Sequence, residues 1–307
     1  MRFLFVDSIT AMHWNEAKGS GSISGRKSFV EPPKGVAEPT LVPGVISEAI
    51  GQLASWLCLK QNDFTARPVF LFAEKIAMHE EVPMGSTVDL SAEIHRLDTE
   101  TFTFSGRANV NGSVVQEIVD CSGWLMPLDQ LEDPAETRRR FAALVDGGLP
   151  PDSSTGMLSK QHLSSLLTNK MIDELIDVEK GDSLSVRRKL GAGEPWYADH
   201  FPRFPVTPIV ILNEMIGAAT HKLLAAHDSS RNSRSDKPKS SRIIARGARD
   251  IKIKSFVRPG DECEIRIGIN SESAPGPDGR REIETTADLI RAGKRLMRGT
   301  FQWEMRP

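Results

Sequence analysis

The sequence predicts an α+β fold in which antiparallel strands wrap around two long apolar helices. Two segments, 41–57 and 208–224, each combine a proline near the start with apolar residues at helical spacing. Each segment follows two short strand-like runs and precedes about four alternating runs. Strands thus follow one another instead of alternating with helices, which favours an antiparallel sheet. The recurrence of this order predicts an internal repeat in the chain.

The first half, residues 1–130, opens with two strand signals, at 3–9 and 21–29. Its helix begins at Pro43 and carries an apolar stripe that Glu48 interrupts. The first half is therefore expected to be one helix enclosed by a sheet. The alternating runs behind the helix predict the remaining strands, at 70–76, 88–94, 101–110 and 114–124.

Residues 131–156 separate the halves and have the polar composition of a linker, with one short helical stretch at 138–144. The three arginines at 138–140 predict a solvated face, with contact to an acidic carrier protein as the alternative. Further along, residues 228–241 are rich in serine, arginine and lysine and contain no apolar residue. This composition predicts a mobile loop.

The second half, residues 157–307, repeats the pattern of the first. Pro202, Pro205 and Pro208 keep the chain extended after His200, because each proline fixes its own φ and disfavours the helical region for its predecessor. The helix can begin only behind these prolines. The runs that follow it predict strands at 243–253, 263–269, 281–290 and 294–303.

The charge and cysteine patterns argue against several classes of function. A formal net charge of −2 gives no argument for nucleic-acid binding, and no basic run is interleaved with aromatic residues. Cys58, Cys121 and Cys263 are far apart and lack metal-ligand spacing, which predicts buried reduced thiols in a cytoplasmic protein. The first apolar run is broken at Asp7, too soon for a signal sequence, and no apolar stretch approaches membrane-spanning length. No metal, cofactor or membrane partner is therefore expected.

An acid and a base lie close together in the second half. Glu214 lies within the apolar helix, where burial shifts a carboxyl pKa upward and leaves a proton to donate. His200 lies just upstream, and histidine has the unperturbed pKa nearest to neutrality, so it can accept a proton. Both residues also have a purely structural reading, as a capping histidine and a buried, hydrogen-bonded carboxyl group.

The run His200-Phe-Pro-Arg-Phe-Pro-Val-Thr-Pro208, with an acid six residues further on, resembles the hotdog-fold 3-hydroxyacyl-(acyl carrier protein) dehydratases. The similarity extends upstream to 193–196 and 175–181 and downstream to 257–261. The resemblance implies that the α+β chain is two tandem hotdog domains, each an antiparallel sheet around a long central helix. Their expected bounds are 1–130 and 157–307, with 131–156 as the linker, and the two domains are expected to pair as a pseudo-dimer.

In single-domain members of this family, the active site forms between two copies, with the histidine from one and the acid from the other. Each half lacks a residue of this active site that the other half has kept. The first half has Glu48 and Gln52 but no histidine between residues 19 and 43, whereas the second has His200 and Glu214 but Ala218 in place of the glutamine. The resemblance therefore implies that His200 pairs with Glu48 across the halves, while Glu214 faces a site without a base. Pairing of His200 with Glu214 within one half is the alternative.

The family binds the thioester carbonyl through a Pro-Gly amide at the start of a helix. Gly44 fits this pattern in the first half, and Ile209 takes the place of the glycine in the second. The motif further implies substrate contacts from Phe201 and Pro208. Arg203 replaces another glycine of the family motif, and the spacing from Pro43 to Glu48 is one residue shorter than that from Pro208 to Glu214.

The resemblance implies a dehydratase that converts a 3-hydroxyacyl thioester to the trans-2-enoyl thioester, in fatty-acid or polyketide-type biosynthesis. The partner is then an acyl carrier protein or coenzyme A thioester, and the double chain has the potential to form a homodimer. Two alternatives come from other classes of function. One is a non-catalytic acyl-binding or scaffold protein, which the replacements at Arg203 and Ile209 favour, and the other is a hotdog thioesterase.

Overall fold

The computed structural model of the chain describes residues 5–29, 40–148, 171–179, 182–231 and 241–307. Most of the loop expected at 228–241, and the part of the expected linker from 149 onward, lie outside these ranges. The strands are β1 (Ser8–Asn15), β2 (Ser20–Ser28), β3 (Ala66–Met78), β4 (Thr87–Leu97), β5 (Thr101–Val110), β6 (Ser113–Pro127), β7 (Glu174–Glu179), β8 (Ser183–Lys189), β9 (Arg242–Ile253), β10 (Glu262–Glu272), β11 (Arg281–Arg291) and β12 (Lys294–Arg306). The helices are α1 (Pro43–Gln61), α2 (Leu128–Leu131), α3 (Pro134–Val145), the 3₁₀ helix η1 (Pro195–Ala198) and α5 (Ile209–Arg231).

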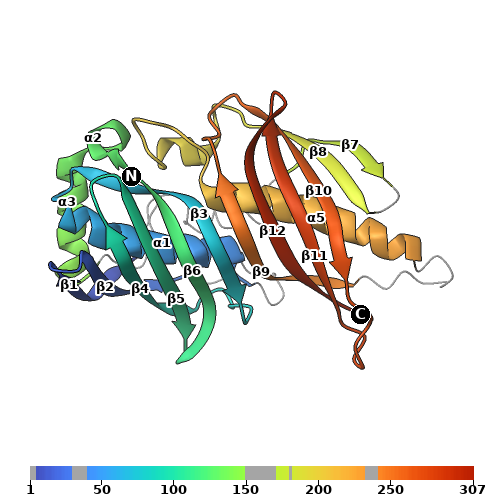
Figure 1. Cartoon of the computed structure of the whole chain (residues 1–307), viewed down its shortest axis with the longest axis horizontal. Coiled ribbons are helices and arrows are strands. Elements are labelled where there is room, and N and C mark those ends of the chain that lie inside the picture. The colour runs from blue at the N-terminus through green and yellow to red at the C-terminus, as the bar shows by residue number, and fades with distance from the viewer. Residues whose placement is uncertain (1–4, 30–39, 149–170, 180–181, 232–240) are drawn as a thin grey trace.

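All twelve strands form one antiparallel sheet in the order β1-β2-β4-β5-β6-β3-β9-β12-β11-β10-β8-β7 (Figure 1). When each half is followed from its outer edge to the centre, its strands come in the same order, with β7 to β12 in the places of β1 to β6. The element order of two strands, a long helix and four strands is also the one that the sequence predicts for each half. At the centre, β3 pairs with β9 from Phe72 opposite Lys252 to Ala77 opposite Gly247, which joins the halves into one sheet.

The long helices α1 and α5 lie on the same side of this sheet (Figure 1). Helix α1 packs against β2, β3, β4 and β5 and also against α5, and nearly all of its residues from Gly44 to Leu59 are buried. A helix that is apolar on all sides is stable only when it is enclosed, which explains why the apolar positions of α1 extend beyond one stripe. The fold thus places the two helices in contact beneath the central strands.

The two helices start at equivalent positions relative to their glutamates, despite the different proline spacing. Pro43 is the first residue of α1, whereas Pro208 immediately precedes the first residue of α5. Glu48 and Glu214 therefore each lie five residues after the first residue of their helix. The shorter spacing in the first half shifts the proline and leaves the acid in the equivalent place.

The first strand is displaced from the position that the sequence predicts. The prediction was 3–9, but β1 spans Ser8–Asn15, and half of its residues are exposed. It forms an edge of the sheet and pairs only with β2. A half-exposed edge strand does not need the apolar alternation by which buried strands are found in a sequence, so its signal was weak.

The segment after β6 packs onto the first half. Asp133 caps α3 by accepting hydrogen bonds from the backbone of the first turn, and Phe141 packs edge-on against Phe64 at 5.4 Å between ring centroids. Arg138 forms an ion pair of 2.6 Å with Asp63. The helical stretch predicted at 138–144 is thus the greater part of a helix that is docked on the core through its apolar side.

The expectation that no apolar stretch approaches membrane-spanning length is wrong. Residues 209–229 of α5 reach a mean hydropathy of 1.3 and are long enough to cross a bilayer, and α5 is the one described helix that meets this criterion. Half of this window is buried inside the protein, and α5 packs against α1, β8 and β10. Its apolar composition therefore follows from its place in the core.

The three cysteines are buried free thiols, as the sequence predicts. Burial raises the pKa of Cys58, Cys121 and Cys263 to about 12 in each case. A thiol with so high a pKa stays protonated and is a poor nucleophile or metal ligand at neutral pH. The cysteines therefore contribute to packing.

Candidate active site

The loop between η1 and α5 places His200 at the wall of a small pocket. The His200 N–H donates to the carbonyl of Trp196 at 2.7 Å, which continues the 3₁₀ turn, and Phe204 N–H donates to the carbonyl of Phe201 at 2.8 Å. Phe201 has a φ of 53°, in the left-handed region that non-glycine residues rarely adopt. These contacts turn the chain sharply, and the rings of His200 and Phe201 both line the pocket, which we call the His200 pocket.

His200 is held as a neutral imidazole in one tautomer. Its Nδ1 lies 3.2 Å from the carbonyl oxygen of Val206, which can only accept, so Nδ1 carries the proton and Nε2 carries the lone pair. Burial lowers the His200 pKa to about 4. The hydrogen bond to the Val206 carbonyl opposes this shift, and the nearby Arg67 charge adds to it. The imidazole is therefore unprotonated at neutral pH, as a general base must be.

Glu48 reaches the same pocket from α1, in the other half of the chain. Gln52, one turn further on, donates from Nε2 to Glu48 Oε1 at 2.9 Å. The amide of Gln52 is itself oriented by the Phe5 N–H, which donates to Gln52 Oε1 at 2.9 Å. Burial raises the pKa of Glu48, against the smaller opposing effects of Gln52 and Arg67. The carboxyl group is thus biased toward its protonated form, with Oε2 as the oxygen that carries the proton.

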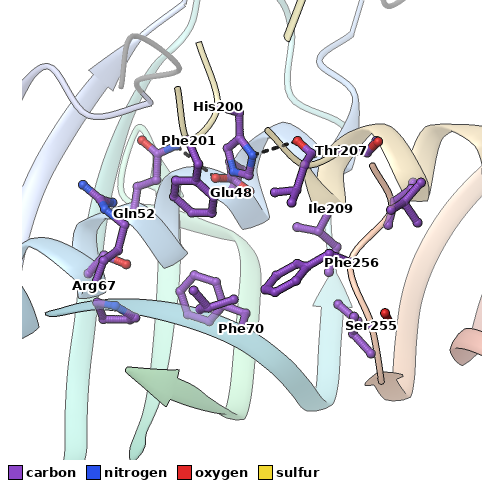
Figure 2. Close-up of a pocket in the computed structure, with 17 residues that line it drawn as sticks. Glu48, Gln52, Arg67, Phe70, His200, Phe201, Thr207, Ile209, Ser255 and Phe256 are labelled. Carbon is purple, nitrogen blue, oxygen red and sulfur yellow. Dashed lines mark hydrogen bonds between the residues drawn. The ribbon is translucent and has the colours of Figure 1, made fainter. Parts of the chain in front are cut away.

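His200 and Glu48 both line this pocket, although they come from different halves of the chain (Figure 2). Gln52 and Phe201 line the same pocket, and so does Ile209 at the start of α5. The cavity volume is about 80 Å³. The structure thus brings together the base, the acid and the glutamine that the sequence assigns to a shared site across the halves. Pro208 does not line this pocket.

Arg67, near the start of β3, also lines the His200 pocket, and no sequence pattern indicated this position. The side chain is almost fully buried, with one guanidinium nitrogen 2.6 Å from Glu132 and its charge over the ring of Trp56 at 5.7 Å. Its charge lowers the pKa of both His200 and Glu48. Because Glu132 is far away in the sequence, no local motif could have indicated this pair.

Glu214 lines a different and larger pocket, which we call the Glu214 pocket. Its volume is about 410 Å³, and Ala218 and Gly44 are also in its wall. Burial raises the Glu214 pKa to about 7. His200 does not line this pocket, so the structure does not bring His200 and Glu214 together.

The expectation that Glu214 faces a site without a base needs correction, because His221 lines the Glu214 pocket. This histidine lies two turns further along the same helix, about 10 Å from Glu214 along the helix axis. Burial lowers its pKa, and its ring packs edge-on against Trp303 at 5.8 Å. The Glu214 pocket thus contains a histidine. His221 and Glu214 belong to the same half of the chain, whereas His200 and Glu48 belong to different halves.

No family model matches the chain. Among curated proteins, the 3-hydroxyacyl-(acyl-carrier-protein) dehydratase FabZ from Thioalkalivibrio sulfidiphilus is 28% identical over 99 residues. That match covers 32% of this chain and 65% of the relative, so the chain spans less than two thirds of that relative's length. The FabZ from Dechloromonas aromatica is 26% identical over 113 residues, or 36% of this chain and 74% of the relative.

Solved structures are similar over nearly the whole chain. A protein from Lactobacillus plantarum assigned as an oleoyl thioesterase has a TM-score of 0.57 at 8% identity, and the alignment covers 93% of this chain and 97% of that one. The tesB protein from Mycobacterium avium subsp. paratuberculosis has a TM-score of 0.51 at 9% identity, with 96% of each chain covered. At this identity the likeness establishes the fold. The chain has a hotdog fold and is similar in sequence to FabZ dehydratases over about a third of its length.

Arg203 lies away from the His200 pocket. Its backbone N–H donates to the carbonyl of Leu131 at 3.0 Å, and its guanidinium donates to the carbonyl of Asp129 at 2.9 Å. Both acceptors belong to α2, so Arg203 ties the histidine loop to the end of the first half. Arg203, which replaces the family's glycine, therefore links the histidine loop to α2 by hydrogen bonds and does not obstruct the pocket.

The N-terminus of α5 borders the His200 pocket through Ile209. Ile209 lines this pocket, and its N–H has no hydrogen-bond acceptor among the residues that the structure describes. The first amides of any helix lack intrahelical partners and carry a partial positive charge. Gly44 lies elsewhere, in the Glu214 pocket, where a Cβ would come within 3.1 Å of Val210. Its lack of a side chain lets the starts of α1 and α5 approach closely.

Proposed function

We propose that this protein is a dehydratase that converts a 3-hydroxyacyl thioester to the trans-2-enoyl thioester. The observation that carries the proposal is the opposite shift of two pKa values in one pocket. The pKa of His200 is lowered and that of Glu48 is raised, so the imidazole is neutral and the carboxyl group is biased toward its protonated form. A neutral base beside a protonated acid is the pair that elimination of water requires.

In the proposed reaction, His200 Nε2 takes a proton from Cα of the substrate. The electron pair of the broken C–H bond forms the Cα–Cβ double bond, and the Cβ–O bond breaks. Glu48 gives its proton to the departing hydroxyl, which leaves as water. The step ends with an imidazolium beside a carboxylate, and a proton transfer between them restores the starting state. Positioned acid and base catalysis of this kind contributes roughly a hundred- to ten-thousand-fold in rate.

The thioester carbonyl needs a hydrogen-bond donor, because removal of the Cα proton places negative charge on its oxygen. The Ile209 N–H at the start of α5 is the proposed donor, since Ile209 lines the pocket and its N–H has no acceptor among the described residues. A backbone amide requires no particular side chain, so an isoleucine can serve in place of the family's glycine. One such donor is typically worth about a hundred- to a thousand-fold in rate.

The proposed architecture is a pseudo-dimer of two hotdog domains, at 1–130 and 157–307, joined by a linker at 131–156. The strand order that repeats from each edge of the sheet supports this division. The pocket between the halves supports it as well, since Glu48 and His200 come from different sides of the proposed boundary. One covalent chain then takes the place of the dimer of single-domain relatives.

The proposed substrate is carried on an acyl carrier protein or coenzyme A, in fatty-acid or polyketide-type biosynthesis. The FabZ relatives, which are named for acyl-carrier-protein substrates, support the first carrier. A cytoplasmic location agrees with the three buried free thiols. A homodimer of the double chain stays a prediction.

The test is an assay of purified protein with a 3-hydroxyacyl thioester. Enoyl absorbance at constant total thioester supports dehydration, free thiol indicates a thioesterase, and binding without change indicates a scaffold. His200→Ala and Glu48→Gln are each expected to lower kcat by at least about a hundredfold. The exposed Glu93→Gln is the control, because it makes the same substitution at a residue that lines neither the His200 pocket nor the Glu214 pocket, and it should keep kcat within about twofold. Full activity of His200→Ala would refute the proposal.

A further inference from the structure

A third cavity lies between the His200 pocket and the Glu214 pocket, and we call it the passage. Its wall includes Phe72, Phe104 and Ile118 and is largely apolar. The residues that it shares with the His200 pocket are Glu48, Phe70, Ile209 and Ile253. The residues that it shares with the Glu214 pocket are Gly44, Ser47, Ile76, Asn213 and Ile251. The three cavities therefore adjoin in a row along the contact between α1 and α5.

The cavities at the two ends of this row differ in size. The His200 pocket and the passage have volumes of about 80 and 50 Å³, too small for a long acyl chain, whereas the Glu214 pocket has about 410 Å³. Cavities of roughly 300 to 1,000 Å³ are typical of small-molecule sites. The end of the row that lacks the catalytic pair is thus the end with room for a ligand.

The difference in size accompanies a difference in how close an aromatic ring lies to two equivalent glycines, one in the wall of the passage and one in the wall of the Glu214 pocket. Gly51 lies three residues after Glu48, and a Cβ there would lie 3.0 Å from the ring of Phe70. Gly217 lies three residues after Glu214, and a Cβ there would meet only the ring of Trp303, at 4.0 Å. An aromatic ring closes this space over α1, whereas the space over α5 stays open.

We infer that the Glu214 pocket receives the distal end of a long unbranched acyl chain whose thioester lies between His200 and Glu48. The chain runs from the His200 pocket through the passage, past Ile209 and Ile251. This inference rests on the proposed function, and it makes long-chain 3-hydroxyacyl thioesters the preferred substrates. The second half-site then serves chain-length selection in place of catalysis.

Gly217→Leu offers a direct test, because the new side chain would project into the Glu214 pocket without meeting backbone atoms. Leucine also has a higher helix propensity than glycine, so the fold of α5 should tolerate it. The probes are dodecyl-coenzyme A and butyl-coenzyme A thioethers, which cannot react, and their binding is measured by calorimetry. The wild-type protein should bind the dodecyl probe at least about tenfold more tightly, because burial of additional methylenes favours binding.

Gly217→Leu should reduce this preference to about twofold and leave affinity for the butyl probe unchanged within about twofold. Gly268→Leu in β10 is the matched control, since a Cβ there meets no atom within 4 Å and the residue lines none of the three cavities, and it should keep the full preference. Equal affinity for the two probes in the wild type, or a preference that Gly217→Leu leaves intact, would overturn the inference.

Turnover of a four-carbon 3-hydroxyacyl thioester separates this inference from the proposed function. If the four-carbon substrate is dehydrated but chain length has no effect on binding, the inference fails and the proposed function stands. If chain-length preference depends on Gly217 but no thioester of either length is dehydrated, the cavity is an acyl-binding site and the proposed dehydration fails.

Discussion

At the scale of single residues, burial shifts the pKa values of His200 and Glu48 in opposite directions. An exposed carboxyl group is charged at neutral pH, and an exposed imidazole is partly charged below pH 7. Desolvation disfavours the charged form of both groups, so it lowers the pKa of one and raises that of the other. The ring and the carboxyl group can therefore lie together as a neutral base and a neutral acid.

This pair of pKa shifts predicts a bell-shaped dependence of kcat/KM on pH. Activity should fall below about pH 4, as His200 becomes protonated, because its pKa is about 4. Activity should also fall on the alkaline side, as Glu48 loses its proton at a pKa above its usual value. Steady-state rates across the pH range measure both limbs. In Glu48→Gln the alkaline limb should disappear, and an unchanged alkaline limb would assign it to another group.

Glu214 provides a stability prediction at the same scale. Its pKa is about 7 in the folded protein and 4.5 in the unfolded chain, so stability from this group is present below pH 4.5 and is lost as pH rises through 7. Glu214→Gln should therefore match the wild type at pH 4 and exceed its free energy of unfolding by about 1 to 3 kcal/mol at pH 8. Urea denaturation at the two pH values measures the difference. The exposed Glu93→Gln should stay within about 0.5 kcal/mol at both, and a Glu214→Gln gain that is equal at pH 4 and pH 8 would rule out this ionisation as the cause.

At the scale of elements, α2 connects the first half to the histidine loop. Its carbonyls accept from Arg203, and Glu132, which follows α2, forms the buried ion pair with Arg67. Arg67 is in β3 and lines the His200 pocket. A short helix after the last strand of the first half thus braces both the loop that carries the base and a charge near the acid.

Arg67→Met should affect both stability and catalysis. Removal of one member of a buried ion pair typically costs about 3 to 5 kcal/mol, and the double variant Arg67→Met/Glu132→Leu should recover much of that loss. Because the Arg67 charge lowers the His200 pKa, its loss should move the acid limb of the pH–rate profile to higher pH. Denaturation and pH–rate measurements test the two effects separately. An unmoved acid limb in a folded Arg67→Met variant would limit Arg67 to a structural role.

At the scale of the whole molecule, the pairing of β3 with β9 holds the two halves in register. A Cβ at Gly247 would lie 2.7 Å from the carbonyl oxygen of Ile76 in the neighbouring strand. Gly247→Val should therefore force the central strands apart, with a loss of about 1 to 3 kcal/mol in stability. Glu48 and His200 come from opposite sides of the β3–β9 pairing. Turnover should therefore fall together with stability in Gly247→Val.

Thermal unfolding and kcat at a temperature where the variant is folded measure the effects of Gly247→Val. Gly268→Val is the control, because it adds the same side chain to a strand where a Cβ meets no atom within 4 Å. A folded Gly247→Val variant with wild-type kcat would show that the geometry of the site does not depend on the β3–β9 pairing.

The element order could be predicted from the sequence because its signals are local. Prolines mark where α1 and α5 start, and apolar periodicity gives their length and that of the buried strands. The position of β1 could not be predicted, since an exposed edge strand lacks alternation. The single sheet could not be predicted either, because the β3–β9 pairing joins residues about 170 positions apart and leaves no pattern in either strand.

The composition of the His200 pocket could be predicted in part, because some of its residues belong to local sequence motifs. The motif around His200 and the complementary losses in the two halves point to Glu48 and Gln52, which the structure places in the same pocket. The contributions of Arg67 and of the Phe5 N–H to this pocket come from tertiary contacts alone. The presence of His221 beside Trp303 in the other pocket likewise depends on how α5 is rotated against β12.

The covalent connection of the two halves has a consequence for how such a protein can diverge. In an assembly of two identical chains, any substitution is copied into both catalytic centres, so neither can be given up. Here the two half-sites draw on different positions of a single polypeptide, and a change such as the absence of a histidine between residues 19 and 43 affects only one of them. Asymmetry of this kind leaves one site intact, while the other site can be selected for a new function.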